Sequence, residues 1–372
     1  MSIAPRDVPF FNYRGAFASL GDPLYDTIKD VIGRGAFIMQ KDLVEFEAAV
    51  ATFLGVKHVF GVGNATDGLH LCYRAAGLKE GDEVIFPSHT MVASPASVVF
   101  AGGVPVPVDI GPDHLIDPSK IEAAITKRTK FIMPVHVNGR TCDMDAIMAI
   151  ANKHGLQVVE DAAQALGSRF NGKPAGTFGI ASSFSLYPAK VLGCLGDGGL
   201  VATDDDAVAD KLHQLRDHGR DRNGEVASWG MNSRLDNLQA AILHLQFRDY
   251  DHIMSHRRAL AAEYQRLLGD VPELVLPPAP DSDPRHFDIY QNYEMECERR
   301  DELKAHLKER GIGTLIQWGG SAVHQFPALG FSVSLPATER FFTRCLMLPM
   351  NMMVTLEDAA YVAQVVRAFY GR

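Results

Sequence analysis

The sequence predicts an α/β protein in which a mostly parallel central sheet is flanked by helices. From about residue 57, short apolar segments typical of strands alternate with helical patterns. The composition is 47% hydrophobic and 22% charged, which is ordinary for a globular protein and allows large buried strands. The length of 372 residues exceeds what one hydrophobic core usually spans. We therefore expect a large domain over residues 1–250 and a smaller α/β domain over residues 251–372.

The large domain is expected to carry the sheet. Its apolar runs of strand length are separated or followed by helical patterns at residues 65–77, 143–154 and 205–217. Strands that alternate with helices in this way favour a parallel sheet covered by those helices. The expected strands cover residues 57–62, 82–86, 104–110, 129–135, 157–160, 181–187 and 199–203.

The C-terminal third has a different composition. A long helical pattern over residues 233–268 is followed by a proline-rich stretch at 276–284, which is typical of a loop between domains. Beyond that loop we expect a strand at 289–297, a helix at 300–310 that stops at a glycine, and a terminal helix at 356–369. These elements form the predicted smaller domain.

Charge and composition exclude several classes of protein. The net charge is −9 and no long run of Lys or Arg occurs, which argues against nucleic-acid binding. The sequence has no apolar run long enough to span a bilayer and no signal-peptide pattern, so we expect a cytoplasmic protein without membrane contact. The five cysteines and 14 histidines show no ligand spacing, so we predict reduced thiols and no metal.

One lysine, Lys190, follows an apolar strand pattern and lies in a glycine-rich turn. A lysine is costly to bury, and burial lowers its pKa, which leaves a neutral amine able to attack a carbonyl. Taken alone, the turn favours a solvated loop lysine. A second observation favours chemistry: Asp161 follows an apolar strand pattern at 156–159. Its carboxylate is expected at the end of a parallel strand, where α/β proteins bind ligands, with a helix N-cap as the alternative role.

Six short segments occur in a fixed order along the chain: 64–69 (NATDGL), 87–90 (PSHT), 160–164 (EDAAQ), 185–190 (SLYPAK), 196–199 (GDGG) and 232–236 (NSRLD). Taken together, they resemble the DegT/DnrJ/EryC1/StrS family of nucleotide-sugar aminotransferases. The resemblance covers nearly the whole chain and implies fold type I with pyridoxal 5'-phosphate as cofactor. In this chemistry the cofactor aldehyde bonds to an amine and the ring takes up the electrons released when a proton leaves carbon.

The resemblance implies roles for the residues around the cofactor. Lys190 matches the Schiff-base lysine, Asp161 the carboxylate that keeps the ring nitrogen protonated, and Gln164 a contact of the phenolic oxygen. Ser185 matches a phosphate-binding hydroxyl. Asn232 matches an asparagine that the neighbouring subunit contributes, which implies a homodimer with shared active sites.

A phosphate site is also expected at the start of the helix at 65–77. The backbone amides of Thr66 and Asp67 precede that helix, whose N-terminal end favours negative charge. Helix capping alone would also explain Thr66.

The chain departs from the family's pattern at several positions. Met91 stands where an aromatic residue usually stacks on the cofactor ring, so the stacking residue is either Met91 or His89. Gln317 and Trp318 occupy a sugar-facing stretch that commonly reads His-Tyr-Pro, and Asn351 replaces a histidine. These changes keep the residues expected to bind the cofactor, but the identity of the sugar substrate does not follow from the sequence.

Four residues are candidates for substrate binding. His89, Gln317 and Trp318 are expected on the sugar side of the site. Arg234 matches an arginine near the substrate end, where it could meet a carboxylate or the nucleotide phosphates. A structural salt bridge is an equal alternative for Arg234.

These observations predict a homodimeric aminotransferase with L-glutamate as donor. The acceptor is expected to be a nucleotide-linked keto-deoxysugar (dTDP, UDP or GDP) with its keto group at the third or fourth carbon. Ping-pong kinetics are predicted. A ketocyclitol aminotransferase, a sugar dehydratase and a non-catalytic cofactor or sugar-nucleotide sensor are alternatives; Lys190 argues against the dehydratase, which has histidine there. The pathway, a surface polysaccharide such as lipopolysaccharide O-antigen or a secondary metabolite, stays open.

Overall fold

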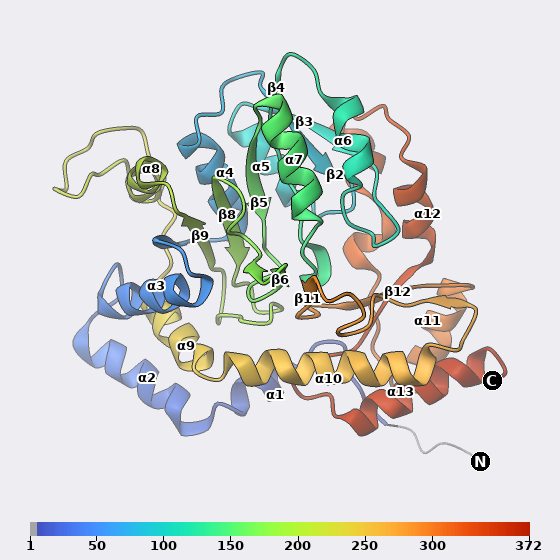
Figure 1. Cartoon of the computed structure of the whole chain (residues 1–372). Helices are drawn as coiled ribbons and strands as arrows, with labels where there is room; N and C mark the ends of the chain where they lie inside the picture. The colour runs from blue at the N-terminus through green and yellow to red at the C-terminus, as the bar shows by residue number, and fades with distance from the viewer. Residues whose placement is uncertain (1–5) are drawn as a thin grey trace.

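A seven-stranded sheet forms the centre of the computed structural model, which describes residues 6–372 (Figure 1). Its strands are β1 (His58–Val62), β2 (Glu83–Pro87), β3 (Val104–Val108), β4 (Thr129–Ile132), β5 (Gln157–Asp161), β8 (Ala181–Ser185) and β9 (Gly199–Thr203). They lie in the order β1-β9-β8-β5-β4-β2-β3, and β9 runs antiparallel to both of its neighbours. The pairs β2–β3, β2–β4, β4–β5 and β5–β8 are parallel. The mostly parallel sheet is therefore confirmed.

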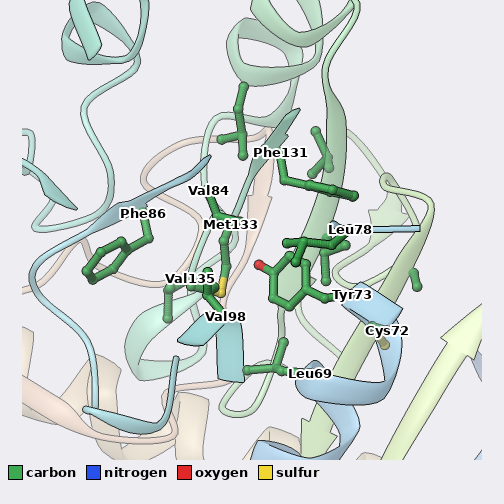
Figure 2. Close-up of a cluster of buried hydrophobic side chains, with 14 of the residues drawn as sticks. Leu69, Cys72, Tyr73, Leu78, Val84, Phe86, Val98, Phe131, Met133 and Val135 are labelled. Carbon is green, nitrogen blue, oxygen red and sulfur yellow. The ribbon is translucent and has the colours of Figure 1, made fainter. Parts of the chain in front are cut away.

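Helices cover both faces of this sheet and bury its apolar side chains. One core contains Tyr73 of α4 and Phe131 of β4, whose ring centroids lie 5.5 Å apart in an edge-to-face arrangement (Figure 2). A second core contains Phe46 and Phe184. The helices of this part are α3 (Lys41–Leu54), α4 (Ala65–Ala75), α5 (Ala93–Phe100), α6 (Pro118–Ala124), α7 (Met144–His154), α8 (Asp206–Arg216) and α9 (Asn237–Phe247).

The C-terminal part has a core of its own. The long helix α10 (Tyr250–Leu268) runs beside the terminal helix α13 (Leu356–Phe369) below the large sheet (Figure 1). The part of the sequence between these two helices forms an antiparallel sheet of β10 (Leu274–Val275), β12 (Tyr293–Cys297) and β13 (Cys345–Leu348). Val8 packs into this core, which ties the N-terminal segment to the C-terminal part. Its other helices are α11 (Arg300–Lys308) and α12 (Pro336–Arg344).

The strands expected at 104–110, 129–135 and 181–187 end two or three residues earlier in the structure, and two other elements differ more. The helical pattern at 233–268 forms two helices, α9 and α10. The strand expected at 289–297 begins only at Tyr293, because Tyr290 has a left-handed backbone with φ of 52°. Elements not predicted from the sequence include α1 (Tyr13–Ala18), α2 (Gly21–Arg34) and a small sheet of β6 (Arg169–Phe170), β7 (Lys173–Pro174) and β11 (His286–Phe287). Within residues 6–372, no helix combines the length and the hydrophobicity needed to cross a bilayer.

Candidate active site

A cavity of about 530 Å³ lies beyond the carboxyl ends of β4, β5 and β8. This is the edge at which parallel α/β sheets bind ligands. Phe10, Phe11, Leu315 and Met347 supply apolar wall. The cavity brings together most of the site residues expected from the sequence: Thr66, Met91, Asp161, Gln164, Ser185, Lys190, Gln317 and Trp318.

Lys190 lies in the turn after β8, with its backbone N–H donated to the carbonyl of Tyr187 at 2.8 Å. Burial lowers the pKa of its amine from 10.5 to about 8, and the negative charge of Asp161 opposes that shift. About a tenth of the amine is therefore neutral at pH 7, against well under a hundredth for an ordinary lysine. The turn thus supplies a lysine that can act as a nucleophile near neutral pH.

Asp161 ends β5 and is 5% exposed. Its Oδ2 accepts a 2.7 Å hydrogen bond from the hydroxyl of Ser94, and its Oδ1 accepts one of 3.1 Å from the N–H of Ala163. Burial raises the pKa of the carboxyl, although these bonds and the charges of Lys190 and His136 pull the pKa down. Within residues 6–372 no cationic side chain lies within ion-pair distance of it. A buried carboxylate facing a cavity without a counter-charge fits a protonated ring nitrogen.

The neighbouring Glu160 fixes the end of β5. It accepts hydrogen bonds from the backbone N–H groups of Gly176, Phe178 and Gly179 at 2.6–2.7 Å and one of 2.9 Å from His136 Nε2. His136 Nδ1 accepts the N–H of Cys142, which places the ring proton on Nε2. This buried pair holds rigid the backbone from which Asp161 projects.

The start of α4 faces the cavity at Thr66, but Asp67 has another role. The N–H of Asp67 is donated to the Asn64 side chain at 2.8 Å, and its carboxylate accepts the hydroxyl of Ser233 at 2.7 Å. In this structure Asp67 therefore holds the helix cap, and its amide, which was expected to face a phosphate, is bonded to Asn64. The first-turn amide of Thr66 has no acceptor within the helix and is free for an anion. Ser185 adds a hydroxyl to the same wall.

Besides Asp67, three expected residues do not line the cavity. His89 is fully buried behind Trp318, with its ring 4.6 Å from that of Phe341 and its Nδ1 bonded to the carbonyl of His114 at 2.7 Å. It is therefore placed neither to stack on a cofactor nor to bind a sugar in this cavity. Met91, which is 53% exposed, lines the cavity at the stacking position.

Arg234 and Asn232 also lie outside the cavity. Arg234 forms a 2.8 Å ion pair with Asp217, which is the structural alternative weighed from the sequence. Asn232 pairs with the same Asp217 through the backbone and is exposed. Its side chain is thus available outside its own chain's cavity.

Sequence reasoning missed other residues of the site. Ser94 bonds Asp161, and Asn138 donates its backbone N–H to Gln164 Oε1 at 2.6 Å. Gln291 and Asn292 line the cavity from the segment between β11 and β12. No local pattern points to Ser94, Gln291 or Asn292. Asn138 follows the fourth expected strand closely, and that position at a strand end could have identified it.

The cavity therefore offers a nucleophilic amine, an unpaired carboxylate and a helix N-terminus. These groups match the aldehyde, ring nitrogen and phosphate of pyridoxal phosphate in chemistry. Lys190 would hold the aldehyde, Asp161 the nitrogen, and Thr66 with Ser185 the phosphate. The residues present fit that group.

Comparisons with known proteins point the same way. The model of the DegT/DnrJ/EryC1/StrS aminotransferase family matches residues 20–367. The dTDP-3-amino-3,4,6-trideoxy-alpha-D-glucose transaminase of Streptomyces venezuelae is 40% identical over 374 residues, which cover 99% of this chain and 97% of that protein. The crystal structure of S. venezuelae DesV superposes with a TM-score of 0.94 at 39% identity, covering 99% of this chain and 100% of that one. Bacillus subtilis ntda, with bound cofactor PMP, gives a TM-score of 0.91 at 30% identity, covering 100% and 86%.

Proposed function

The chain belongs to the DegT/DnrJ/EryC1/StrS aminotransferase family, and from that premise we propose that it transfers the amino group of L-glutamate to a dTDP-linked ketosugar. It is a pyridoxal-phosphate-dependent aminotransferase of nucleotide-linked sugars. The observation that carries this function is the presence of Lys190 and Asp161 in one cavity, with the pKa of the lysine lowered and that of the aspartate raised.

The bound cofactor supplies an aldehyde for the amine and an electron-accepting ring. The residues of this chain bind and orient it and move protons. Asp161 holds a proton on the ring nitrogen, and Ser94 and Ala163 fix its carboxylate in place. When Lys190 is free, its neutral Nζ takes a proton from the substrate carbon and returns it, which is the role of a general base with a pKa near the working pH.

The nucleotide, the donor and the carbon aminated are part of the proposal. A relative that is 40% identical over nearly the full length is named for a dTDP-linked 3-amino sugar, so a dTDP-3-ketosugar is the first substrate to test. The neutral amide of Gln317 and the indole of Trp318 line the cavity and suit sugar hydroxyls. Initial rates at varied glutamate and ketosugar should give parallel double-reciprocal lines; intersecting lines would contradict the alternating half reactions.

The amine of Lys190 should limit how fast the apoenzyme takes up its cofactor below pH 8. The protonated amine is not a nucleophile. The rate at which Lys190 bonds to the cofactor should therefore rise about tenfold per pH unit up to a midpoint of about 8, and then level off. Stopped-flow absorbance of apoenzyme mixed with pyridoxal phosphate measures this rate. A midpoint near 10.5, the value of an unburied lysine, would contradict the assigned environment.

We also propose a homodimer in which Asn232 completes the site of the partner. Two inactive variants, Lys190→Ala and Asn232→Ala, should then restore activity when they are mixed after subunit exchange. Random pairing gives half heterodimers with one intact site each, so about a quarter of wild-type activity is expected. Turnover of the mixture measures this effect. No recovery, with exchange verified by differently tagged chains, would place Asn232 in its own chain's site or outside the chemistry.

A further inference from the structure

The turn that carries Lys190 is held by a side chain from a distant part of the sequence. Gln291 is 5% exposed and lies in the segment between β11 and β12. Its Oε1 accepts the N–H of Val191 at 2.9 Å, and its Nε2 donates to the carbonyl of Ala189 at 2.8 Å. These two bonds bracket Lys190 on both sides.

A side-chain amide is suited to this position. The residues around Lys190 belong to no helix or strand, and within the turn itself the Lys190 N–H bonds only back to Tyr187. The backbone of this turn therefore lacks the regular hydrogen bonds of a helix or strand, and the side chain of Gln291 supplies hydrogen bonds in their place. Only Asn and Gln present a donor and an acceptor side by side in one plane, and Gln has the longer reach.

Gln291 is in turn fixed through its own backbone. Arg257 of α10 donates from Nε to the carbonyl of Tyr290 at 2.8 Å and from Nη2 to the carbonyl of Gln291 at 2.6 Å. Arg257 is 7% exposed, and among residues 6–372 no carboxylate pairs with it. A buried guanidinium that bonds carbonyls in place of a carboxylate is costly unless those carbonyls are held in position. Tyr290, with φ of 52°, has the left-handed backbone that these bonds stabilise.

The same segment reaches the other side of the cavity. Asn292 Nδ2 donates to Asn138 Oδ1 at 2.8 Å, and the N–H of Asn138 is donated to Gln164 Oε1 at 2.6 Å. Residues 291 and 292 therefore connect the lysine turn with the glutamine expected at the phenolic oxygen. A displacement of this segment would move both.

We propose that Gln291 is a positioning residue that aims Lys190 into the cavity, and that Arg257 anchors Gln291 to α10. The inference rests on the proposed function only for what Lys190 does once aimed. Gln291 itself touches no reacting atom. Its loss should lower turnover without weakening sugar binding, because the amine is misplaced while the sugar wall is intact.

The test compares Gln291→Leu with Gln239→Leu. Gln239 supplies a matched control, because its Oε1 accepts the N–H of Leu195 at 2.8 Å in the same loop, away from Lys190. Gln291→Leu should lower kcat about 10- to 100-fold and leave the KM for the nucleotide ketosugar within about twofold. Gln291→Glu, which keeps the acceptor and loses the donor, should fall between Gln291→Leu and wild type. Gln239→Leu should match wild type.

A second readout needs neither cofactor nor substrate. Reductive methylation of the apoenzyme by formaldehyde and cyanoborohydride at a series of pH values, followed by mass spectrometry of the Lys190 peptide, reports the pKa of the amine. In Gln291→Leu the midpoint should move from about 8 toward 10.5, because a loosened turn exposes the amine to water. Melting temperatures of both variants establish that they are folded.

Two results would overturn the inference. One is a folded Gln291→Leu with wild-type kcat and an unchanged methylation midpoint. The other is an equal loss in Gln239→Leu, which would show a general sensitivity of the loop. A wild-type enzyme that fails to bond its cofactor at Lys190 would instead overturn the proposed function, and the methylation readout would still decide the role of Gln291.

Discussion

Lys190→Ala should reduce turnover by about 10³-fold or more while the protein stays folded. The substitution removes both the amine that bonds the cofactor and the base that moves the proton at the substrate carbon. A small primary amine added to the assay should restore part of the activity, since it can replace both functions from solution. Steady-state kinetics with and without the added amine measure the effect. Lys153→Ala, at an exposed lysine paired with Glu122, is the control and should leave turnover unchanged.

Lys190 should also destabilise the folded apoenzyme. The pKa of Lys190 is lowered in the fold from 10.5 to about 8, so between these values the unfolded chain binds more protons and stability rises with pH. Below about pH 8 the cost is present in full, up to about 3 kcal/mol. Lys190→Met should therefore melt higher than wild-type apoenzyme at pH 7, and this advantage should shrink from pH 8 to 10.5. A lower melting temperature at pH 7 would contradict the burial assigned to the amine.

Asp161→Asn should be the second most damaging change, with a loss of about 10²- to 10³-fold in kcat/KM. An amide cannot balance the charge of a protonated ring nitrogen, and breaking a buried charge pair costs about 2–5 kcal/mol. Affinity for the cofactor should fall as well, which fluorescence titration of the apoenzyme measures. Wild-type turnover in Asp161→Asn would show that the ring nitrogen does not need this carboxylate.

Without cofactor, Asp161→Asn should stabilise the folded protein, although it damages the holoenzyme. The pKa of Asp161 is raised in the fold, chiefly by burial, so the folded chain keeps a proton that the unfolded chain loses. Wild-type stability therefore falls as pH rises above 3.8, and Asp161→Asn should gain an advantage over the same range. Asp109 provides the contrast: burial raises its pKa, but hydrogen bonds from Thr338 and Ala337 lower it overall. Asp109→Asn should destabilise the apoenzyme, and thermal melts of the three proteins test both signs.

The elements that the sequence predicted well are those with a complete local pattern. The strand at 199–203 and the helix at 356–369 match their bounds, because the apolar pattern lies within each segment and Thr355 caps the helix directly before it. The break between α9 and α10 was not visible, since both halves have the same helical period. Residues 289–292 read as strand because their pattern is apolar and β-like. Their actual path depends on Arg257 and on Gly139, where a Cβ would lie 2.8 Å from the Gln291 nitrogen.

The same distinction holds for the site. Asp161 ends one strand and Lys190 lies in the turn after another, so their position at the sheet edge could be predicted from neighbouring residues. Ser94 and Gln291 reach the cavity from elements far away in sequence, and their roles depend on tertiary contacts. His89 was expected in the cavity, but Trp318, Phe341 and Phe342 surround its ring. A short segment shows which residues lie near a site, whereas the side-chain direction is set by packing.

The central claim is that Lys190 and a bound pyridoxal phosphate carry an amino group from glutamate to a nucleotide ketosugar. Absorbance spectra of the holoenzyme test it most directly, recorded first with L-glutamate alone and then after addition of a dTDP-3-ketosugar. We expect glutamate to bleach the visible band of the lysine-bound cofactor with release of one 2-oxoglutarate per site, and the ketosugar to restore the band. Lys190→Ala should show neither change. A wild-type spectrum that glutamate leaves unaltered, or that no nucleotide ketosugar restores, would contradict the account.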